Sequence, residues 1–205
     1  MTIIEMKNHR NIQIKELTKC YGGEQVLDRL CLSLDMHRTY CLMAPSGTGK
    51  TTLFRILMGL EKADSGTIQG LEDKRIAAVF QEDRLLDGYT ALENIRFVTG
   101  NRYSSAELSS ILSRILPKES LEKPVYEFSG GMRRRTAILR AILAPSDLII
   151  MDEPFTGLDM KTKENTIELI KEYTVGKLIL LATHNEEDVK LLSAEIIRLN
   201  NPQRF

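Results

Sequence analysis

The sequence lacks any hydrophobic run long enough to cross a membrane. Its longest apolar stretches, such as residues 178–182, fall far short of the roughly 18 residues that a spanning helix needs. Residues 1–10 also lack the apolar core of a signal peptide. We therefore expect neither a transmembrane helix nor a targeting segment.

The chain has no net charge, because 28 Lys and Arg residues balance 28 Asp and Glu residues. A balanced chain has no overall field that would recruit nucleic acid. The basic run Arg133-Arg134-Arg135 is short, and on a helix it is typical of a solvated surface or of one that faces a second copy of the chain. We therefore expect no nucleic-acid partner.

Cysteine is scarce, with three residues at positions 20, 31 and 41. Their wide and uneven spacing is unlike that of zinc ligands. At least two of them fall in apolar strand patterns. We therefore expect buried free thiols in a reducing cytoplasm.

The 205-residue length is typical of one α/β domain with a sizeable core. Residues 1–38 contain alternating apolar and polar positions, which predict an antiparallel β part. Residues 39–81 and 129–205 alternate apolar runs with helical patterns, which predict a mainly parallel sheet covered by helices. Residues 82–128 show no strong strand pattern.

Three helices are expected outside the glycine-rich segment. Residues 90–98 and 105–116 are amphipathic, and a Ser-Ser pair suited to an N-cap opens the second helix. A third helix is predicted over residues 131–143 and ends before Pro145, which cannot continue it.

A phosphate-binding loop is the strongest motif in the chain. Ala-Pro-Ser-Gly-Thr-Gly-Lys-Thr-Thr follows a predicted strand at residues 39–43 and opens a predicted helix at residues 49–59. The apolar face of that helix is expected to contain Leu53, Ile56, Leu57 and Leu60. The predicted phosphate-binding residues are Ala44, Pro45, Ser46, Gly47, Thr48, Gly49, Lys50, Thr51 and Thr52.

The residue types of this loop suit a triphosphate. Gly47 and Gly49 permit backbone conformations that aim N–H groups at phosphate oxygens, and the helix N-terminus adds partial positive charge. Lys50 is expected to reach the β and γ phosphates, and the Thr51 hydroxyl to ligate Mg²⁺. Ala44 replaces the first glycine of the pattern and suits the turn if its φ is negative. A glycine-rich loop without a ligand is the alternative.

Two carboxylates follow a buried strand pattern. Residues 148–154 read Leu-Ile-Ile-Met-Asp-Glu-Pro, and the apolar run predicts a parallel strand that delivers acids at its carboxyl end. Asp152 is expected to hold Mg²⁺, and Glu153 to polarise the attacking water. A buried strand followed by a polar turn is the alternative.

Three further residues have both a functional and an ordinary interpretation. Gln81 and His184 each follow an apolar run, at strand ends that suit ligand contact in an open α/β sheet. A polar strand end and a structural histidine are the alternatives. For Tyr21, a surface aromatic in a turn is the alternative.

These motifs resemble, over nearly the whole chain, the ATP-binding subunit of ABC (ATP-binding cassette) transporters. Tyr21-Gly22 resembles the aromatic loop that stacks on adenine, and Gln81 matches the Q-loop. Residues 128–132, Phe-Ser-Gly-Gly-Met, resemble the signature motif. Residues 157–159 resemble the D-loop, and Thr183-His184 matches the H-loop.

The resemblance implies a P-loop NTPase fold of the ABC type, with an antiparallel β subdomain and an inserted helical subdomain at residues 82–128. It implies ATP and Mg²⁺ as ligands and an active ATPase. The implied catalytic residues are Glu153, His184, Gln81 and Lys50. The implied metal-binding residues are Thr51, Gln81 and Asp152.

The signature motif implies a second subunit. In the family it closes over ATP held by another protomer, so Ser129, Gly130 and Gly131 are expected to act in trans. Two copies of the chain, or one copy and a homologous subunit, would then sandwich two ATP molecules head to tail. Met132 replaces the usual glutamine and cannot make the polar contacts of that side chain.

Further partners follow from the same resemblance. Residues 80–86 and 90–94 resemble importer ATPases of the nitrate, sulfonate and taurine group. This implies import of a small solute, a separate permease, a solute-binding protein and a peripheral location on the cytoplasmic face of the membrane. No room is expected for a C-terminal regulatory domain. A lipoprotein-release or export ATPase and a soluble, non-transport ABC ATPase remain the alternatives.

Overall fold

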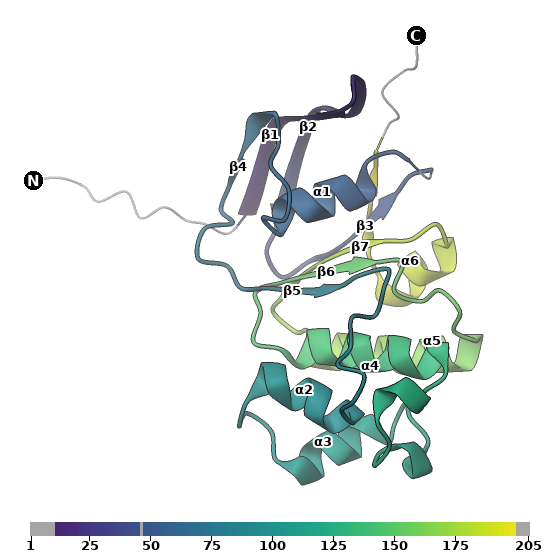
Figure 1. The fold of residues 1–205 in the computed structure, drawn as a ribbon. Helices are drawn as coiled ribbons and strands as arrows, with labels where there is room; N and C mark the ends of the chain where they lie inside the picture. Colours follow the sequence, from purple (N-terminus) through teal and green to yellow (C-terminus); the bar gives the residue numbers. More distant parts are fainter. Residues whose placement is uncertain (1–10, 46, 200–205) are drawn as a thin grey trace, which may run out of the picture.

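The computed structural model describes residues 11–45 and 47–199. Two sheets and two sets of helices form successive layers (Figure 1). The central sheet is parallel and has the strand order β5-β6-β7-β3-β8. Its strands are β3 (Thr39–Met43), β5 (Ile76–Val79), β6 (Leu148–Asp152), β7 (Leu178–Ala182) and β8 (Glu195–Arg198). This arrangement confirms the predicted α/β fold class.

The second sheet is antiparallel and has three strands in the order β2-β1-β4. These strands are β1 (Asn11–Tyr21), β2 (Glu24–Asp35) and β4 (Ser65–Gln69). We expected the antiparallel part to end near residue 38, with residues 39–81 in the parallel core; β4 departs from that expectation. Gly66 permits the pairing, because a Cβ there would lie 2.5 Å from the Glu16 carbonyl oxygen of β1.

The helices lie on both faces of the parallel sheet. In Figure 1, α1 lies between the two sheets, α4 and α5 lie on the other side of the parallel sheet, and α2 and α3 lie beyond them. The helices are α1 (Lys50–Leu57), α2 (Ala91–Thr99), α3 (Ser105–Leu112), α4 (Gly130–Leu143), α5 (Met160–Tyr173) and α6 (Glu186–Leu192). Short 3₁₀ turns, η1 (Lys118–Ser120) and η2 (Val125–Glu127), precede α4.

Alternation along the central strands divides the core in two. Leu148 and Ile150 of β6 pack with α1 and the antiparallel sheet. Ile149 and Met151 of the same strand pack with the helices of the opposite face. Because successive side chains of a strand point to opposite faces, a strand buried on both faces is apolar throughout. This explains the unbroken apolar run before Asp152.

Two predicted helices are shorter than expected. Helix α1 ends at Leu57, and Gly59 has a φ of 70° that cannot continue it. Leu60 therefore falls outside the apolar face and is 54% exposed, so its predicted burial was wrong. Helix α3 ends at Leu112 instead of residue 116, although Leu116 remains buried in the turn that follows.

The cysteines correct a second expectation. All three are free thiols, but only Cys41 is buried, while Cys20 and Cys31 are exposed. Cys41 lies on β3, which is covered on both faces, whereas the other two lie on the irregular antiparallel sheet. Burial raises the pKa of the Cys41 thiol to about 11.

Candidate active site

A cavity of about 440 Å³ lies where the strands β3 and β6 of the parallel sheet end. In an open parallel sheet this carboxyl edge is the usual place for ligands. The cavity is lined by Tyr21, Val26, Gly47, Gly49, Lys50, Thr51, Thr52, Gln81, Asp152 and Glu153. The structure therefore brings together, from four separate segments, nine of the residues that the sequence assigned to nucleotide binding, metal binding or catalysis. Ala44, Pro45, Thr48 and His184 are not among the lining residues. Ser46 lies outside the described residues.

The glycine-rich loop depends on glycine at defined positions. Gly47 and Gly49 have φ values of 81° and 86°, in the left-handed region that glycine adopts without strain. A Cβ on Gly49 would also lie 2.8 Å from the Val26 carbonyl oxygen and 2.7 Å from a Leu27 methyl group. Only glycine therefore fits at the residue that precedes α1. Ala44 does not have a positive φ, which agrees with a tolerated replacement of the first glycine.

Polar side chains hold the loop in shape from within. The Thr48 hydroxyl is buried and donates a hydrogen bond of 2.7 Å to the Pro45 carbonyl. The Lys50 ammonium donates to the carbonyls of Ala44 at 2.6 Å and Pro45 at 2.9 Å. The lysine charge therefore lies over the loop, at the N-terminus of α1, where an anion would also be favoured by the helix dipole.

One hydroxyl and one carboxylate meet beside this loop. The Thr51 hydroxyl donates a hydrogen bond to Asp152 Oδ2 at 2.8 Å, and this bond joins the first turn of α1 to the end of β6. Mg²⁺ prefers oxygen ligands and retains several waters and phosphate oxygens, so two protein oxygens at one point suit it. Gln81, the third predicted metal ligand, lines the same cavity.

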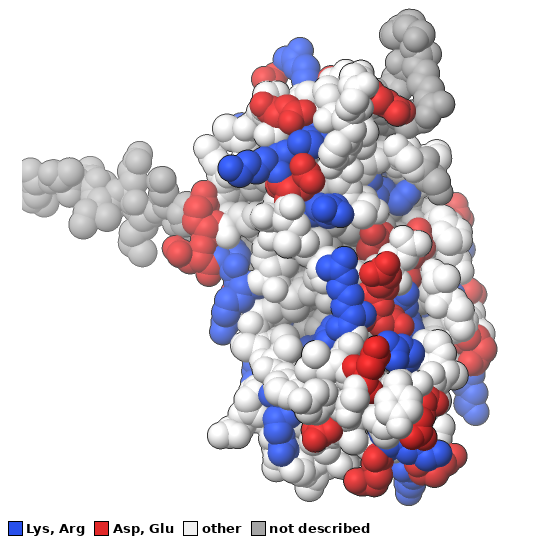
Figure 2. Space-filling view, in the orientation of Figure 1, with Lys and Arg blue, Asp and Glu red and all other residues white. Residues whose placement is uncertain are grey.

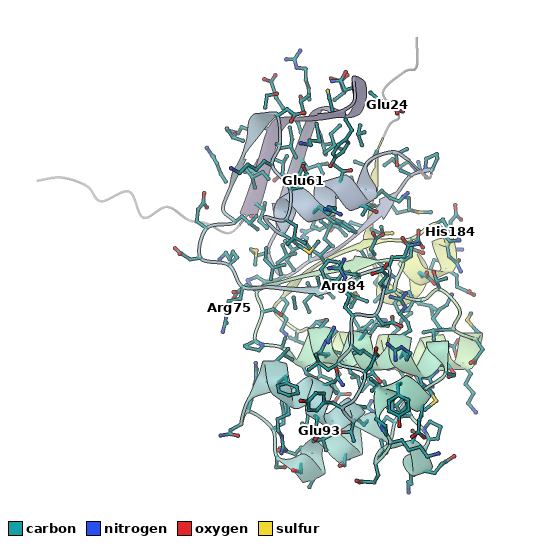
Figure 3. All side chains as sticks on the ribbon, viewed as in Figure 1. Glu24, Glu61, Arg75, Arg84, Glu93 and His184 are labelled. Atoms are coloured by element: carbon teal, nitrogen blue, oxygen red, sulfur yellow. The ribbon has the colours of Figure 1, made fainter. Side chains whose placement is uncertain are left out.

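Glu153 and His184 lie together at the ends of neighbouring strands. The Glu153 backbone N–H donates to the Ala182 carbonyl of β7 at 3.0 Å, and Glu153 has a φ of 47°. Such a conformation is strained for a non-glycine residue and is concentrated at functional sites. His184 Nδ1 lies 3.1 Å from Glu153 Oε2. The histidine side chain is 80% exposed, and Figure 3 shows it at the rim of the sheet.

A buried ion pair fixes the residues next to His184, and the sequence motifs did not predict it. Lys163 of α5 and Asp188 of α6 form an ion pair of 2.7 Å, and the other Asp188 oxygen accepts from the Thr183 hydroxyl at 2.7 Å. That hydroxyl also accepts from the Asn185 N–H. The residues on both sides of His184 are therefore fixed to two helices.

Tyr21 lines the cavity from the antiparallel sheet and is 44% exposed. The Lys19 ammonium lies 5.1 Å from the centre of its ring. Lys19 also contacts Glu61 and Asp64, each at 3.1 Å, and these acids raise the pKa of Lys19. The tyrosine ring thus lies beside a charged cluster and at the cavity.

The signature residues do not line the cavity. Ser129 is the N-cap of α4, where its hydroxyl accepts from the Met132 N–H at 3.3 Å, and both Ser129 and Gly130 are exposed. Gly131 lies beside the predicted D-loop, since a Cβ there would be 3.6 Å from Leu158. The helix N-terminus is thus exposed and lies outside the cavity that the glycine-rich loop lines.

We expected the arginine run that follows to form a surface that is solvated or faces a second copy of the chain, and for Arg134 the structure corrects that expectation. Arg134 is buried and makes its contacts within the chain, while Arg133 pairs with Asp87 at 2.6 Å. The burial of Arg134 could have been predicted from the sequence. Arg134, Ala137, Ile138 and Ala141 recur at the spacing of one helix face, and all four are buried.

Within residues 11–45 and 47–199, no helix combines the length and apolar character needed to cross a bilayer. Charged side chains of both signs are interspersed over the face shown in Figure 2.

Comparisons with known proteins place this geometry in a family. The ABC transporter family model matches residues 27–156. Nod factor export ATP-binding protein I of Cupriavidus metallidurans is 35% identical over 199 residues, covering 88% of this chain but 65% of that protein. Taurine import ATP-binding protein TauB of Escherichia coli O157:H7 is 33% identical over 205 residues, covering 92% of this chain and 79% of that protein.

A solved structure has the same fold. The dimeric, post-hydrolysis structure of the ATP-binding cassette MJ0796 with ADP and Pi superimposes with a TM-score of 0.80 and 27% identity, covering 93% of this chain and 94% of that one. The first two relatives extend beyond the chain, which spans 65% of the length of each. The chain therefore belongs to the ABC transporter family and has the fold of its P-loop ATPase domain.

Proposed function

We propose that the chain binds Mg²⁺-ATP, hydrolyses it to ADP and phosphate, and powers an ABC transporter. One observation carries this proposal. Lys50 and the Thr51–Asp152 pair line one cavity together with Glu153, and His184 contacts the Glu153 carboxylate. Phosphoryl transfer to water depends on such positioning and charge stabilisation more than on covalent chemistry.

The residues have distinct proposed roles. Lys50 binds the β and γ phosphates, Tyr21 stacks on the adenine, and Glu153 accepts hydrogen bonds from the attacking water and orients it. His184 holds the Glu153 carboxylate and contacts the γ-phosphate region, and Gln81 contacts the same region. Thr51, Gln81 and Asp152 would hold Mg²⁺, which would neutralise phosphate charge.

Ser129, Gly130 and Gly131 are proposed to bind the nucleotide of a second subunit. Two facts support this role. Ser129 and Gly130 are exposed outside the cavity at a helix N-terminus, which favours anions. The similar MJ0796 cassette is a dimer. Hydrolysis would then remove a phosphate that joins the two subunits, shifting the population from closed to open dimers.

We further propose a peripheral location on the cytoplasmic face of a membrane, with a separate permease as partner. Import of a small solute, aided by a solute-binding protein, is supported by the likeness to the taurine importer subunit. Export is the second candidate, because the Nod factor export protein is 35% identical. Affinity capture of the tagged chain from its own cells distinguishes them: a permease with a solute-binding protein supports import, whereas a permease without one supports export.

Glu153→Gln tests the proposed hydrolysis. The amide cannot orient water as the carboxylate does, so we expect turnover to fall about 100-fold or more while ATP binding is retained. Glu164→Gln, an exposed acid on α5, is the matched control and should keep the wild-type rate. A Glu153→Gln protein with wild-type ATPase activity would overturn the assignment.

A further inference from the structure

Arg134 holds the backbone of the predicted Q-loop. We use the name Gln81 loop for residues 80–87, which lead from β5 towards α2. Arg134 Nη1 donates to the Phe80 carbonyl at 2.7 Å, and Nη2 donates to the Gln81 carbonyl. Its Nε lies 3.2 Å from an Asp83 carboxylate oxygen. One buried guanidinium therefore fixes the residue that enters the active-site cavity.

A second arginine of α4 holds the next part of the loop. Arg140 donates to the Arg84 carbonyl at 2.8 Å and to the Asp83 carbonyl at 3.2 Å. Arg84 has a φ of 46°, and its guanidinium lies 3.8 Å from the centre of the Phe80 ring. The Gln81 loop is thus attached to α4 along its length.

Helix α4 begins at the signature motif. Its N-cap, Ser129, precedes Arg134 by five residues, or roughly 7.5 Å of helix rise. A helix of 14 residues packed on the core moves as a unit, so displacement of its N-terminus carries Arg134 with it. The same helix therefore presents Ser129 outward and holds the Gln81 backbone inward.

We propose that Arg134 is a positioning residue for hydrolysis. Through Arg134, the placement of Gln81 against the ATP bound by the same chain depends on the contact that Ser129 makes with the ATP of a second subunit. This inference rests on the proposed function. Arg134 does not touch the nucleotide and acts through the Gln81 backbone. Its planar fork holds two carbonyls at once, which the single ammonium of a lysine cannot do in the same geometry.

The test uses steady-state ATP hydrolysis by the full chain. For Arg134→Met we expect kcat to fall at least about ten-fold while the KM for ATP stays within about two-fold, because misplacement affects the transition state and not phosphate binding. Arg134→Lys retains the charge beside Asp83 and should keep the melting temperature yet show the same loss of kcat. The lysine variant also keeps the test decisive if Arg134→Met does not fold.

A double-mutant cycle distinguishes positioning from general stabilisation. If Arg134 acts through Gln81, adding Arg134→Lys to Gln81→Ala should lower kcat no further. Arg114→Met is the matched control, since Arg114 makes an exposed 2.7 Å ion pair with Glu172 far from the loop in sequence. Its kcat should stay within about two-fold of the wild type.

Three results would overturn the inference: an unchanged kcat in Arg134→Lys, a rise in KM that accounts for the loss, or losses that multiply in the double mutant. These failures are distinct from failure of the proposed function. If Glu153→Gln hydrolyses ATP at the wild-type rate, the proposed function fails. If only the Arg134 variants behave as the wild type, ATP hydrolysis by Glu153 stands and the link from α4 does not.

Discussion

The glycine-rich loop and the N-terminus of α4 both have features that suit phosphate binding, but only the loop lines a cavity within the chain. Thr48, Lys50 and Thr51 each make hydrogen bonds within the chain, and the loop faces a cavity lined by residues of several strands. Ser129 and Gly130 also stand at a helix N-terminus, yet they are exposed and lie outside that cavity. The first region is a complete half-site, whereas the second needs another surface.

This difference indicates how the chain divides its work. A region stabilised by its own contacts can bind nucleotide in a single chain. A region that lies outside this cavity can contact a nucleotide only across an interface with another subunit. ATP then shifts the population towards the closed dimer, because it binds that dimer better than the open one. Variants of the two regions should therefore separate nucleotide binding from dimerisation.

The largest effect is expected from Gly49→Val. The residue has a left-handed φ, and a Cβ would lie 2.8 Å from the Val26 carbonyl oxygen, so the loop must distort. We expect ATP binding to be lost altogether, as measured by isothermal titration calorimetry. Gly130→Ala is the matched control, because no atom lies within 4 Å of its added Cβ, and binding to the single chain should be unchanged. Wild-type affinity in Gly49→Val would contradict a preformed loop.

The next effect concerns the buried support of His184. Asp188→Leu leaves the Lys163 ammonium unpaired, and breaking one side of a buried ion pair costs about 3–5 kcal/mol of unfolding free energy. Adding Lys163→Met removes the stranded charge and should recover most of that stability. Urea unfolding gives the energies. A loss in Asp188→Leu that the second substitution does not relieve would contradict pairing as its cause.

The smallest effect is expected from Met132→Gln, which restores the usual signature residue. Met132 is partly buried against the helical core, and its N–H is already bound to the Ser129 hydroxyl. We expect kcat and KM within about two-fold of the wild type, because the phosphate contacts come from Ser129 and the glycine N–H groups. A large loss of turnover in an ATPase assay would show that Met132 has a specific role.

Local motifs allowed the sequence to predict the fold class and to select nine of the ten residues that line the cavity, all except Val26. The apolar runs predicted β3, β6 and β7, and the residues after them, including Glu153, fall at one sheet edge. The exposed state of Cys20 and the pairing of β4 could not be predicted, because both depend on strand register between distant segments.

The buried side chains of Lys163 and Arg134 were not predicted from the sequence motifs. Lys163 recurs with Thr166, Ile167 and Ile170 at the spacing of one helix face, and Arg134 does the same on α4. Burial of each was therefore visible in the pattern. Their partners were not, because Asp188 and the Gln81 carbonyl come from segments whose approach is decided by the packing of α4, α5 and α6.

Sedimentation velocity of the Glu153→Gln protein, with and without ATP and Mg²⁺, tests the two-subunit site most directly. A slow-turnover variant keeps its ATP, so we predict a monomer that becomes a dimer when ATP is added. Adding Ser129→Arg should leave ATP binding to the single chain intact and abolish that dimer, because the bulky side chain occupies the phosphate-facing end of α4. A normal ATP-dependent dimer in the Glu153→Gln/Ser129→Arg protein would contradict the account.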